Sequence, residues 1–338
     1  MKQRMILLTS VFLSLTSFAH AEPQQVPSTA VIDEAHAIKE ATSLLGLADE
    51  FTVVGNTKLD SYFVGAKRII FKSGARLIFS DKAINSRNNL IVAARTIVSE
   101  DQLNPGTITW DSEASADEVS PISGQSPGGA HGRGDGASGG PGSNGALGNP
   151  GSSGSNAPNL VLFVQQFENA PPKVILHGQN GGKGGIGQRG GDGGVGQRGS
   201  PASQSAFDCK SGPGHGGNGG PGGVGGKGGQ GGQGGTGGTV TLVSLPSAFP
   251  ALLQLVRVDV GPGDGGPGGD GGQGGDGGPA GEAGEKSLPY CQARPDRRGS
   301  PGANGGIGAI GDPGGQGIQG DILFTTLDSS GFDNIFSK

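Results

Sequence analysis

A glycine period of three is the feature that most constrains how this chain can fold. The stretch HGGNGGPGGVGGKGGQGGQGGTGGTV, residues 215–240, carries one variable side chain in every three residues and continues directly into TVTLVSL. A period of three matches an extended left-handed helix with three residues per turn and a rise of about 3.1 Å per residue. Such a helix makes no internal hydrogen bonds, so its backbone must bond to water or to neighbouring segments.

Five segments carry this period, and we number them in chain order. They are residues 136–154, 178–199, 215–239, 261–284 and 299–320. The third segment has glycine at two positions in three, which predicts an interior helix, because an all-glycine face lets another backbone approach closely. The first and fifth segments have one all-glycine face, as expected at the edges of a bundle, and the second is intermediate.

Three interpretations of these segments are open, and we favour a polyglycine-II bundle formed within one chain. A collagen-like trimer needs glycine at one position in three and proline-rich pairs between, which the doubled glycines of the third segment match poorly. Disorder is the remaining alternative, but amphipathic strand-like stretches interrupt the glycine, which a disordered tract would not contain. These stretches are NLVLFVQQF (159–167), KVILH (173–177), TVTLVSL (239–245), LLQLVRVDV (252–260) and DILFTTL (321–327).

The rest of the chain predicts a mainly β fold. Glycine accounts for 73 of 338 residues and only 32% are hydrophobic, so an ordinary apolar core over the whole length is excluded. Short runs between residues 51 and 111 are bounded by turn residues and predict strands: FTVV, SYFV, KRIIF, ARLIF, NLIVAA, TIV and TITW. The run GAKRIIFKSGARLIF resembles successive turns of right-handed parallel β-helices, so we predict a small right-handed β-solenoid over 51–111.

The flanking regions predict an exported protein. Residues 1–21 have a charged start, a short apolar core and an Ala19-His20-Ala21 cleavage site, as in a secretory signal peptide. We expect a leader with a helix over 22–50, a linker over 112–127, a glycine-rich region interleaved with strands over 128–327, and a tail over 328–338. Removing the signal takes away Lys2 and Arg4, so the formal net charge of −5 becomes −7. We therefore expect no nucleic-acid partner and no membrane span.

The two cysteines provide a geometric test of the bundle. Residues 200–211 connect the second and third segments, residues 287–298 connect the fourth and fifth, and each connection contains one cysteine. If the segments alternate out and back, both connections lie at the same far end. Cys209 and Cys291 are then neighbours, and in an oxidising compartment we expect them to form a disulfide.

The same two connections contain the candidate binding residues. Aromatic and charged side chains on a cross-linked loop suit recognition of a cell-surface glycan or protein. The alternative is that Phe207 and Tyr290 only cover the disulfide. The candidates are Phe207, Asp208, Lys210, Tyr290, Arg294, Arg297 and Arg298.

No pattern in the sequence indicates catalysis, a metal or a cofactor, so we expect a non-enzymatic protein. The mature histidines, His36, His131, His177 and His215, lack metal-ligand spacing. Asp264, Asp270 and Asp276 follow one another at steps of about 19 Å along an extended helix, which is too far for two of them to share one calcium ion. We therefore expect a solvated acidic row opposite Arg189 and Arg198. The triplet Arg133-Gly134-Asp135 would suit integrin-type binding, but chance explains it in a region of this composition.

The glycine runs support one family-level comparison. The G-G-x and G-x-y runs in residues 128–320 resemble the polyglycine-II bundles of phage long-tail-fibre adhesins and springtail antifreeze proteins, and such sequences are also labelled collagen-like glycine-rich repeats. The resemblance to the adhesins implies receptor binding by distal loops. A structural role in an envelope or extracellular matrix is the alternative. Ice binding is a third, although the variable rows carry Lys, Gln, Asp and Pro instead of flat Ala or Thr.

Overall fold

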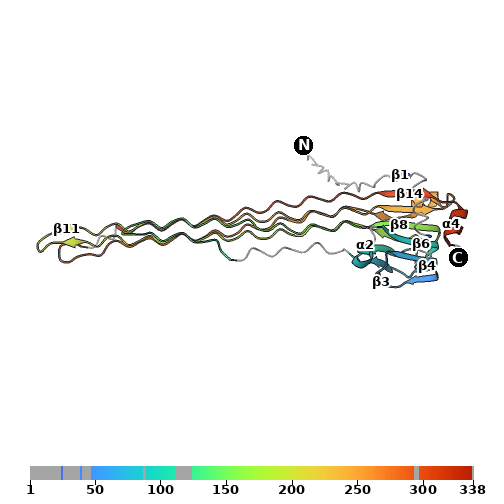
Figure 1. Ribbon diagram of the computed structural model, residues 1–338, viewed down its shortest axis with the longest axis horizontal. Coiled ribbons are helices and arrows are strands. Elements are labelled where there is room, and N and C mark those ends of the chain that lie inside the picture. Colours follow the sequence, from blue (N-terminus) through green and yellow to red (C-terminus); the bar gives the residue numbers. More distant parts are fainter. Residues whose placement is uncertain are drawn as a thin grey trace, which may run out of the picture.

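The protein consists of a β-rich base, a long thin stalk and a small tip (Figure 1). A computed structural model describes residues 24–25, 39, 47–86, 89–111, 124–292 and 297–336. The base contains residues 47–111, the strands that interrupt the glycine-rich region, and the C-terminal helix. The five glycine-rich segments form the stalk, and residues 200–213, 285–292 and 297–298 form the tip.

Two parallel sheets form the base. The larger has the order β1-β14-β12-β8-β6-β4-β2 and the smaller the order β13-β9-β7-β5-β3. The larger sheet contains β1 (Gln24–Gln25), β14 (Ile322–Thr326), β12 (Val240–Ser244), β8 (Asn159–Glu168), β6 (Asn89–Ser99), β4 (Phe63–Phe71) and β2 (Ala48–Val53). The smaller contains β13 (Val258–Asp259), β9 (Lys173–Ile175), β7 (Thr107–Trp110), β5 (Arg76–Phe79) and β3 (Asn56–Leu59).

From β2 to β9, successive strands alternate between the two sheets, so each pass of the chain adds one strand to each. The side chains between the sheets form the main apolar core, in which Phe71, Phe79 and Leu160 are fully buried. A second cluster lies where helix α4 (Ser329–Phe336) buries Phe332 and Phe336 in contact with apolar side chains of the larger sheet. Burial on both faces explains why β6 and β8 are nearly continuous apolar runs.

The predicted strands are present with some changes. β2 begins at Ala48, inside the expected leader. Most of the helix predicted in the leader lies outside the described residues, and the one described residue between 26 and 46, Lys39, is helical. SYFV and KRIIF join into β4, while β3 and the short helix α2 (Asp81–Ser86) were not predicted. The prediction of one strand over 252–260 is wrong, because Phe249–Leu255 forms helix α3, with Pro250 in its first turn, and only Val258–Asp259 pairs as a strand.

The C-terminal residues form a helix where the sequence suggested a tail. α4 follows Asp328, whose carboxylate accepts the N–H of Gly331 at 2.7 Å. This contact caps the first turn, and it helps to hold the pKa of Asp328 below its usual range. Arg95 of β6 pairs with Asp333 at 2.9 Å and lies over the ring of Phe336. The helix is thereby fixed against the larger sheet.

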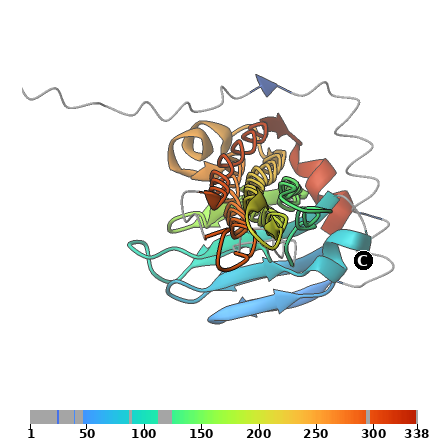
Figure 2. The ribbon, with the colours of Figure 1, turned by 90° about the vertical axis from the view of Figure 1, so that its left-hand side faces the viewer.

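The stalk continues the hydrogen bonding of the sheets. Leu160 of β8 donates to the carbonyl of Thr239, and the next bonds, from Ala157 to Thr236 and from Gly154 to Gln233, follow at three-residue steps with N···O distances of 2.7–2.9 Å. The first, third and fifth segments form one layer through such bonds, and the second and fourth form another. Figure 2, seen along the stalk from the tip, shows the segments projecting together from the base.

Bonds between the two layers explain the doubled glycines. In the third segment, Gly220 donates to Gly194 of the second and accepts from Gly278 of the fourth, both at 2.8 Å. A Cβ atom at Gly220 would lie 1.9 Å from the carbonyl oxygen of Gly140. The third segment therefore has neighbours on both sides, as its doubled glycines predict, while the first and fifth lie at the edges of their layer.

Many of the N–H groups at the variable positions are satisfied by side chains. Asn side-chain oxygens accept them from the neighbouring segment of the same layer: Asn144 accepts from Val224 at 3.0 Å, and Asn156 accepts from Thr236 at 2.8 Å. A further short segment, 124–132, was not predicted, although its end falls in the GGAHG run. It runs beside the second segment, where the N–H of Gly129 donates to the backbone carbonyl of Asp192 at 2.7 Å.

Candidate functional site at the tip

The tip is built from two chain reversals that the disulfide joins. The first is a hairpin of β10 (Ser203–Gln204) and β11 (Cys209–Ser211), and the second passes through an antiparallel bridge between Ser287 and Cys291. Cys209 and Cys291 form the predicted disulfide, with their Cα atoms 5.1 Å apart. The prediction from the glycine periods, that both connections lie at one end, is thereby confirmed.

Polar contacts also hold the two reversals together. The side-chain amide of Gln204 donates to the carbonyl of Leu288 at 2.7 Å, and its oxygen accepts the N–H of Tyr290 at 3.3 Å. Below them, Ala202 donates to the carbonyl of Glu285 at 2.8 Å. The disulfide and these bonds join the two reversals into one unit, which we call the tip platform.

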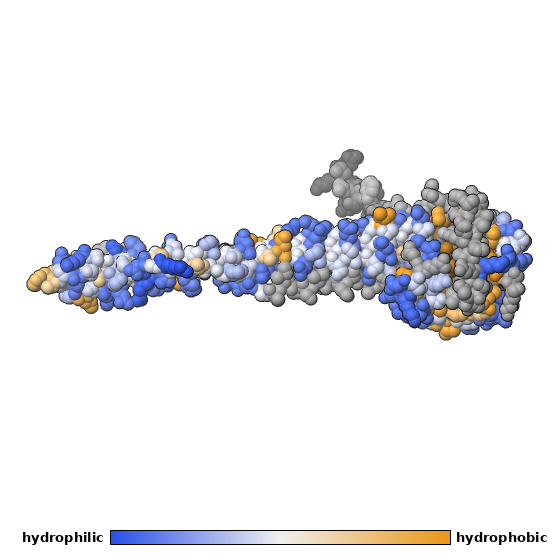
Figure 3. Space-filling view, viewed as in Figure 1, coloured by the Kyte–Doolittle hydropathy of each residue, from blue (hydrophilic) through white to orange (hydrophobic). Residues whose placement is uncertain are grey.

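Three apolar side chains project from this platform. Phe207 is 87% exposed, Leu288 is 59% exposed and Tyr290 is 45% exposed, whereas Cys291 is buried. The exposed ring of Phe207 does not cover the disulfide, which removes the covering role for that residue. Leu288 was missed by sequence reasoning, since a single leucine beside proline gives no signal. Apolar surface is visible at the end of the tip in Figure 3.

The charged candidates divide into two groups. Asp208 and Lys210 are exposed beside Phe207, and the Asp208 carboxylate accepts the N–H of Cys209 at 2.8 Å. Arg297 and Arg298 instead connect neighbouring segments where the stalk meets the tip. The Arg297 guanidinium donates to the carbonyl of Pro213, and Arg298 pairs with Glu282 at 3.0 Å. Arg294 lies outside the described residues.

The acidic row of the fourth segment lies opposite basic residues of the second, as predicted in part. Asp276 pairs with Arg189 at 2.9 Å, as expected, and Asp270 pairs with Lys183 at 2.9 Å. Arg198 instead pairs with Glu285, beyond the row, at 2.7 Å, and the Asp264 carboxylate accepts from the amide of Gln316 in the fifth segment at 3.2 Å. The row is therefore exposed, and two of its three carboxylates form ion pairs with the second segment.

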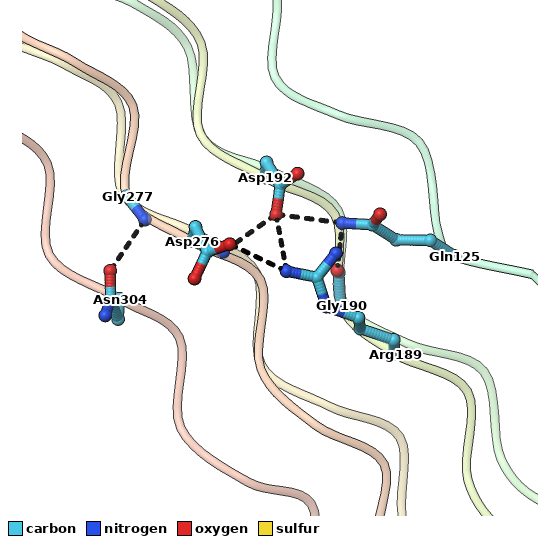
Figure 4. A network of polar contacts seen from close by, with 7 residues as sticks. All are labelled: Gln125, Arg189, Gly190, Asp192, Asp276, Gly277 and Asn304. Atoms are coloured by element: carbon cyan, nitrogen blue, oxygen red, sulfur yellow. Dashed lines mark hydrogen bonds and ion pairs between the residues drawn. The ribbon is translucent and has the colours of Figure 1, made fainter.

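Asp192 is the centre of the densest polar network on this face (Figure 4). Its carboxylate accepts the backbone N–H of Asp276 at 2.8 Å, the amide of Gln125 at 2.9 Å and the guanidinium of Arg189 at 3.1 Å. The pKa of Asp192 is lowered, chiefly because the backbone N–H of Asp276 bonds to the ionised form. The network connects the short segment 124–132 to the second and fourth segments.

The Arg133-Gly134-Asp135 triplet lies at the turn between the short segment and the first segment. Gly134 and Gly136 have φ angles of 87° and 69°, and the three residues of the triplet are exposed. The positive φ angles explain the glycines, because side chains rarely adopt this conformation. The triplet is separate from the tip platform in the chain and makes no part of it.

Comparisons with known proteins give little guidance. No family model matches the chain, and no curated protein matches it. Among solved structures, it is similar to a springtail antifreeze protein from Granisotoma rainieri, a bundle of nine polyproline type II helices, with 23% identity, 62% of this chain and 100% of that chain covered, and a TM-score of 0.11. A likeness this weak carries no argument. No helix in the described part of the chain has the length and apolar character needed to cross a bilayer.

Proposed function

We propose that this is an exported, adhesin-like recognition protein that binds a cell-surface glycan or protein through its tip. The observation that carries the proposal is the 87% exposure of the Phe207 ring on a loop held by a disulfide. Leu288 and Tyr290 are exposed on the same tip, and exposed apolar side chains that gather in one place mark an interaction site. A loop that a disulfide holds before binding also loses little entropy when it binds. The proposed function is therefore recognition without catalysis.

The proposal includes a finer description of the fold. The base is a small right-handed β-solenoid, and the stalk is a polyglycine-II bundle formed by its elongated loops. Support comes from the alternation of strands between the sheets and from hydrogen bonds repeated at every third residue. A segment of about 22 residues spans roughly 70 Å at the rise of such a helix. The stalk would hold the tip well away from the base.

Two independent features support the proposal that the protein is exported. Residues 1–21 have the pattern of a secretory signal, and the disulfide between Cys209 and Cys291 requires an oxidising compartment to persist. We place the mature protein in the periplasm, on the cell surface or outside the cell.

The tip residues have different proposed roles. Phe207, Leu288 and Tyr290 provide the apolar contact surface, and Lys210 with Asp208 provides polar contacts at its rim. Arg297 and Arg298 already bond to neighbouring segments, so they support the platform from below. The proposed contact residues therefore lie on both reversals, and binding depends on the link between them.

The test measures binding of the labelled full-length mature protein to an array of immobilised glycans and to intact cells. We expect Phe207→Ala and Tyr290→Ala each to weaken binding at least about 10-fold, as hot-spot aromatics do. Leu103→Ala is the matched control, since Leu103 is 97% exposed but belongs to the base. Binding that survives both tip substitutions, or that Leu103→Ala weakens equally, would refute the tip as the site.

A further inference from the structure

The long edge of the stalk formed by the fifth segment is left open. In the third segment, every third glycine donates its N–H to the next segment of the layer, as Gly225 does to the carbonyl of Gly306 at 2.9 Å. The fifth segment is the last of its layer, so the N–H groups at its equivalent positions point away from the stalk. In the fifth segment these positions carry side chains, and Ile307 and Ile310 are 67% and 68% exposed. Among the described residues, no partner accepts the N–H groups of Ile307 and Ile310. The row contains Pro301, Asn304, Ile307, Ile310, Pro313, Gln316 and Gln319.

The opposite edge of this layer is formed by the first segment and carries a different row of side chains. The N–H groups that point from the first segment toward the second layer are satisfied: Gly140 and Ser143 donate to carbonyls of the short segment 124–132 at 2.7 and 3.0 Å. Nearer the base, Ala146 and Ser155 donate to glutamine side chains of the second segment at 3.2 and 2.9 Å. The exposed row of the first segment has a single large aliphatic side chain, Leu147, between an asparagine and a proline, whereas the fifth-segment row has two isoleucines in succession.

Charge distinguishes the fifth-segment edge from the second and fourth segments. Acidic and basic residues occupy the variable rows of the fourth and second segments, whereas the edge row contains none. The one charged residue of the fifth segment, Asp312, pairs with Lys227 of the third at 2.6 Å. Since the whole chain has a formal net charge of −5, two copies repel one another over much of their surface. They can meet along this edge without bringing like charges together.

The size of the edge suits a weak dimer. From Pro301 to Gln319 the row covers 18 residue steps, or about 56 Å at a rise of about 3.1 Å per residue. A strip about 10 Å wide would bury roughly 550 Å² on each copy and about 1,100 Å² in total, which is near the lower limit for specific interfaces. Natural proteins usually protect open backbone edges from pairing by placing charged residues or prolines on them. This edge has no charged residue and two prolines, so most of its length is unprotected.

We propose that the fifth-segment edge is an interface with a second copy of this chain, centred on Ile307 and Ile310. The contact is isologous, so the same row packs against itself across a two-fold axis. Association would cover the aliphatic side chains and bring open N–H groups near carbonyls of the partner. A dimer would also carry two tips, which would raise avidity for a repetitive surface, although the dimer does not depend on what the tips bind.

Sedimentation of the full-length mature protein from about 1 to 100 µM tests the proposal, since interfaces near the lower size limit are typically weak and transient. We expect the wild type to shift from monomer to dimer over this range. The double substitution Ile307→Asp with Ile310→Asp should remain monomeric throughout. Leu147→Asp is the matched control, because Leu147 is also 67% exposed but lies on the first segment, and it should dimerise like the wild type.

A second measurement locates the contact without adding charge. Ile310→Cys should form an intermolecular disulfide much faster than Leu147→Cys under the same oxidising conditions. A wild type that stays monomeric at 100 µM would overturn the proposal, as would a Leu147→Asp variant that loses dimerisation to the same extent. Equal cross-linking of the two cysteine variants would also overturn it, because the contact would then not favour the fifth-segment edge.

Discussion

The base and the stalk of this protein are stabilised by different kinds of interaction. The base buries large side chains such as Phe71, Phe79 and Leu160 between and against parallel sheets. The stalk has almost no side chains inside it, and its segments are joined by backbone hydrogen bonds of 2.7–3.0 Å at every third residue. Removal of atoms should therefore damage the base, and addition of atoms should damage the stalk. Glycine in the stalk is therefore a packing residue, because it lets the backbones of neighbouring segments come into contact.

The largest expected effect is in the base. Phe71→Ala removes a fully buried ring from the main core, and we expect the free energy of unfolding to fall by about 3–5 kcal/mol. Trp110 is the only tryptophan of the chain, is buried in the base and donates to the carbonyl of His177 at 2.9 Å. Its fluorescence during denaturant unfolding measures the change. If the Phe71→Ala variant unfolds at the same denaturant concentration as the wild type, the core does not depend on this ring.

A smaller but still large effect is expected in the stalk. A Cβ atom at Gly229 would lie 1.8 Å from the carbonyl oxygen of Asn149, so Gly229→Ala must separate the first and third segments. Loss of two or three hydrogen bonds between them would cost about 2–3 kcal/mol. Hydrogen exchange of stalk amides measures the loss of protection, and we expect the Trp110 transition to shift less than these amides do.

Gly306→Ala is the matched control for that substitution. No atom lies within 4 Å of a Cβ atom at Gly306, which is also in the stalk but faces open space. We expect it to be neutral or stabilising by up to about 1 kcal/mol, because alanine restricts the unfolded chain. If both alanine variants destabilise the stalk equally, the glycines act through flexibility, and the packing explanation fails.

The smallest expected effect concerns pH and the ion pairs of the stalk. The pKa of Asp192 is below its unfolded value, so its contribution to stability is present above the unfolded pKa and is lost as the pH falls through the folded pKa. Asp192→Asn keeps an acceptor for the N–H of Asp276 but removes the charge. The difference in stability between wild type and variant should be small at pH 7 and should shrink as the pH falls through the lowered pKa of Asp192. A difference that is unchanged by acid would exclude the carboxylate charge as its cause.

Much of the candidate site could be predicted, since it depends on local patterns. The ends of the glycine periods located both reversals, and one cysteine in each predicted the disulfide that forms. Exposure could not be predicted in the same way. Phe207 and Arg297 occupy similar loops, yet the ring of Phe207 projects outward and the guanidinium of Arg297 bonds to Pro213 of the neighbouring reversal. A side chain's contacts on such a loop depend on the other loop, which is distant in sequence.

The sequence by itself determined which segments can pack backbone to backbone, because only glycine leaves room for a carbonyl where a Cβ atom would be. The alternating apolar runs also located most strands of the base, although not β3 and not the helices α2 and α3, and the ends of the glycine periods located the chain reversals. The tertiary structure decided the partners. The pairing of Leu160 with Val240 fixes the register in which the first and third segments bond along the stalk. A glycine repeat fits equally well at every three-residue step, so only the side chains packed in the base, which have one best arrangement, select the register of the whole stalk.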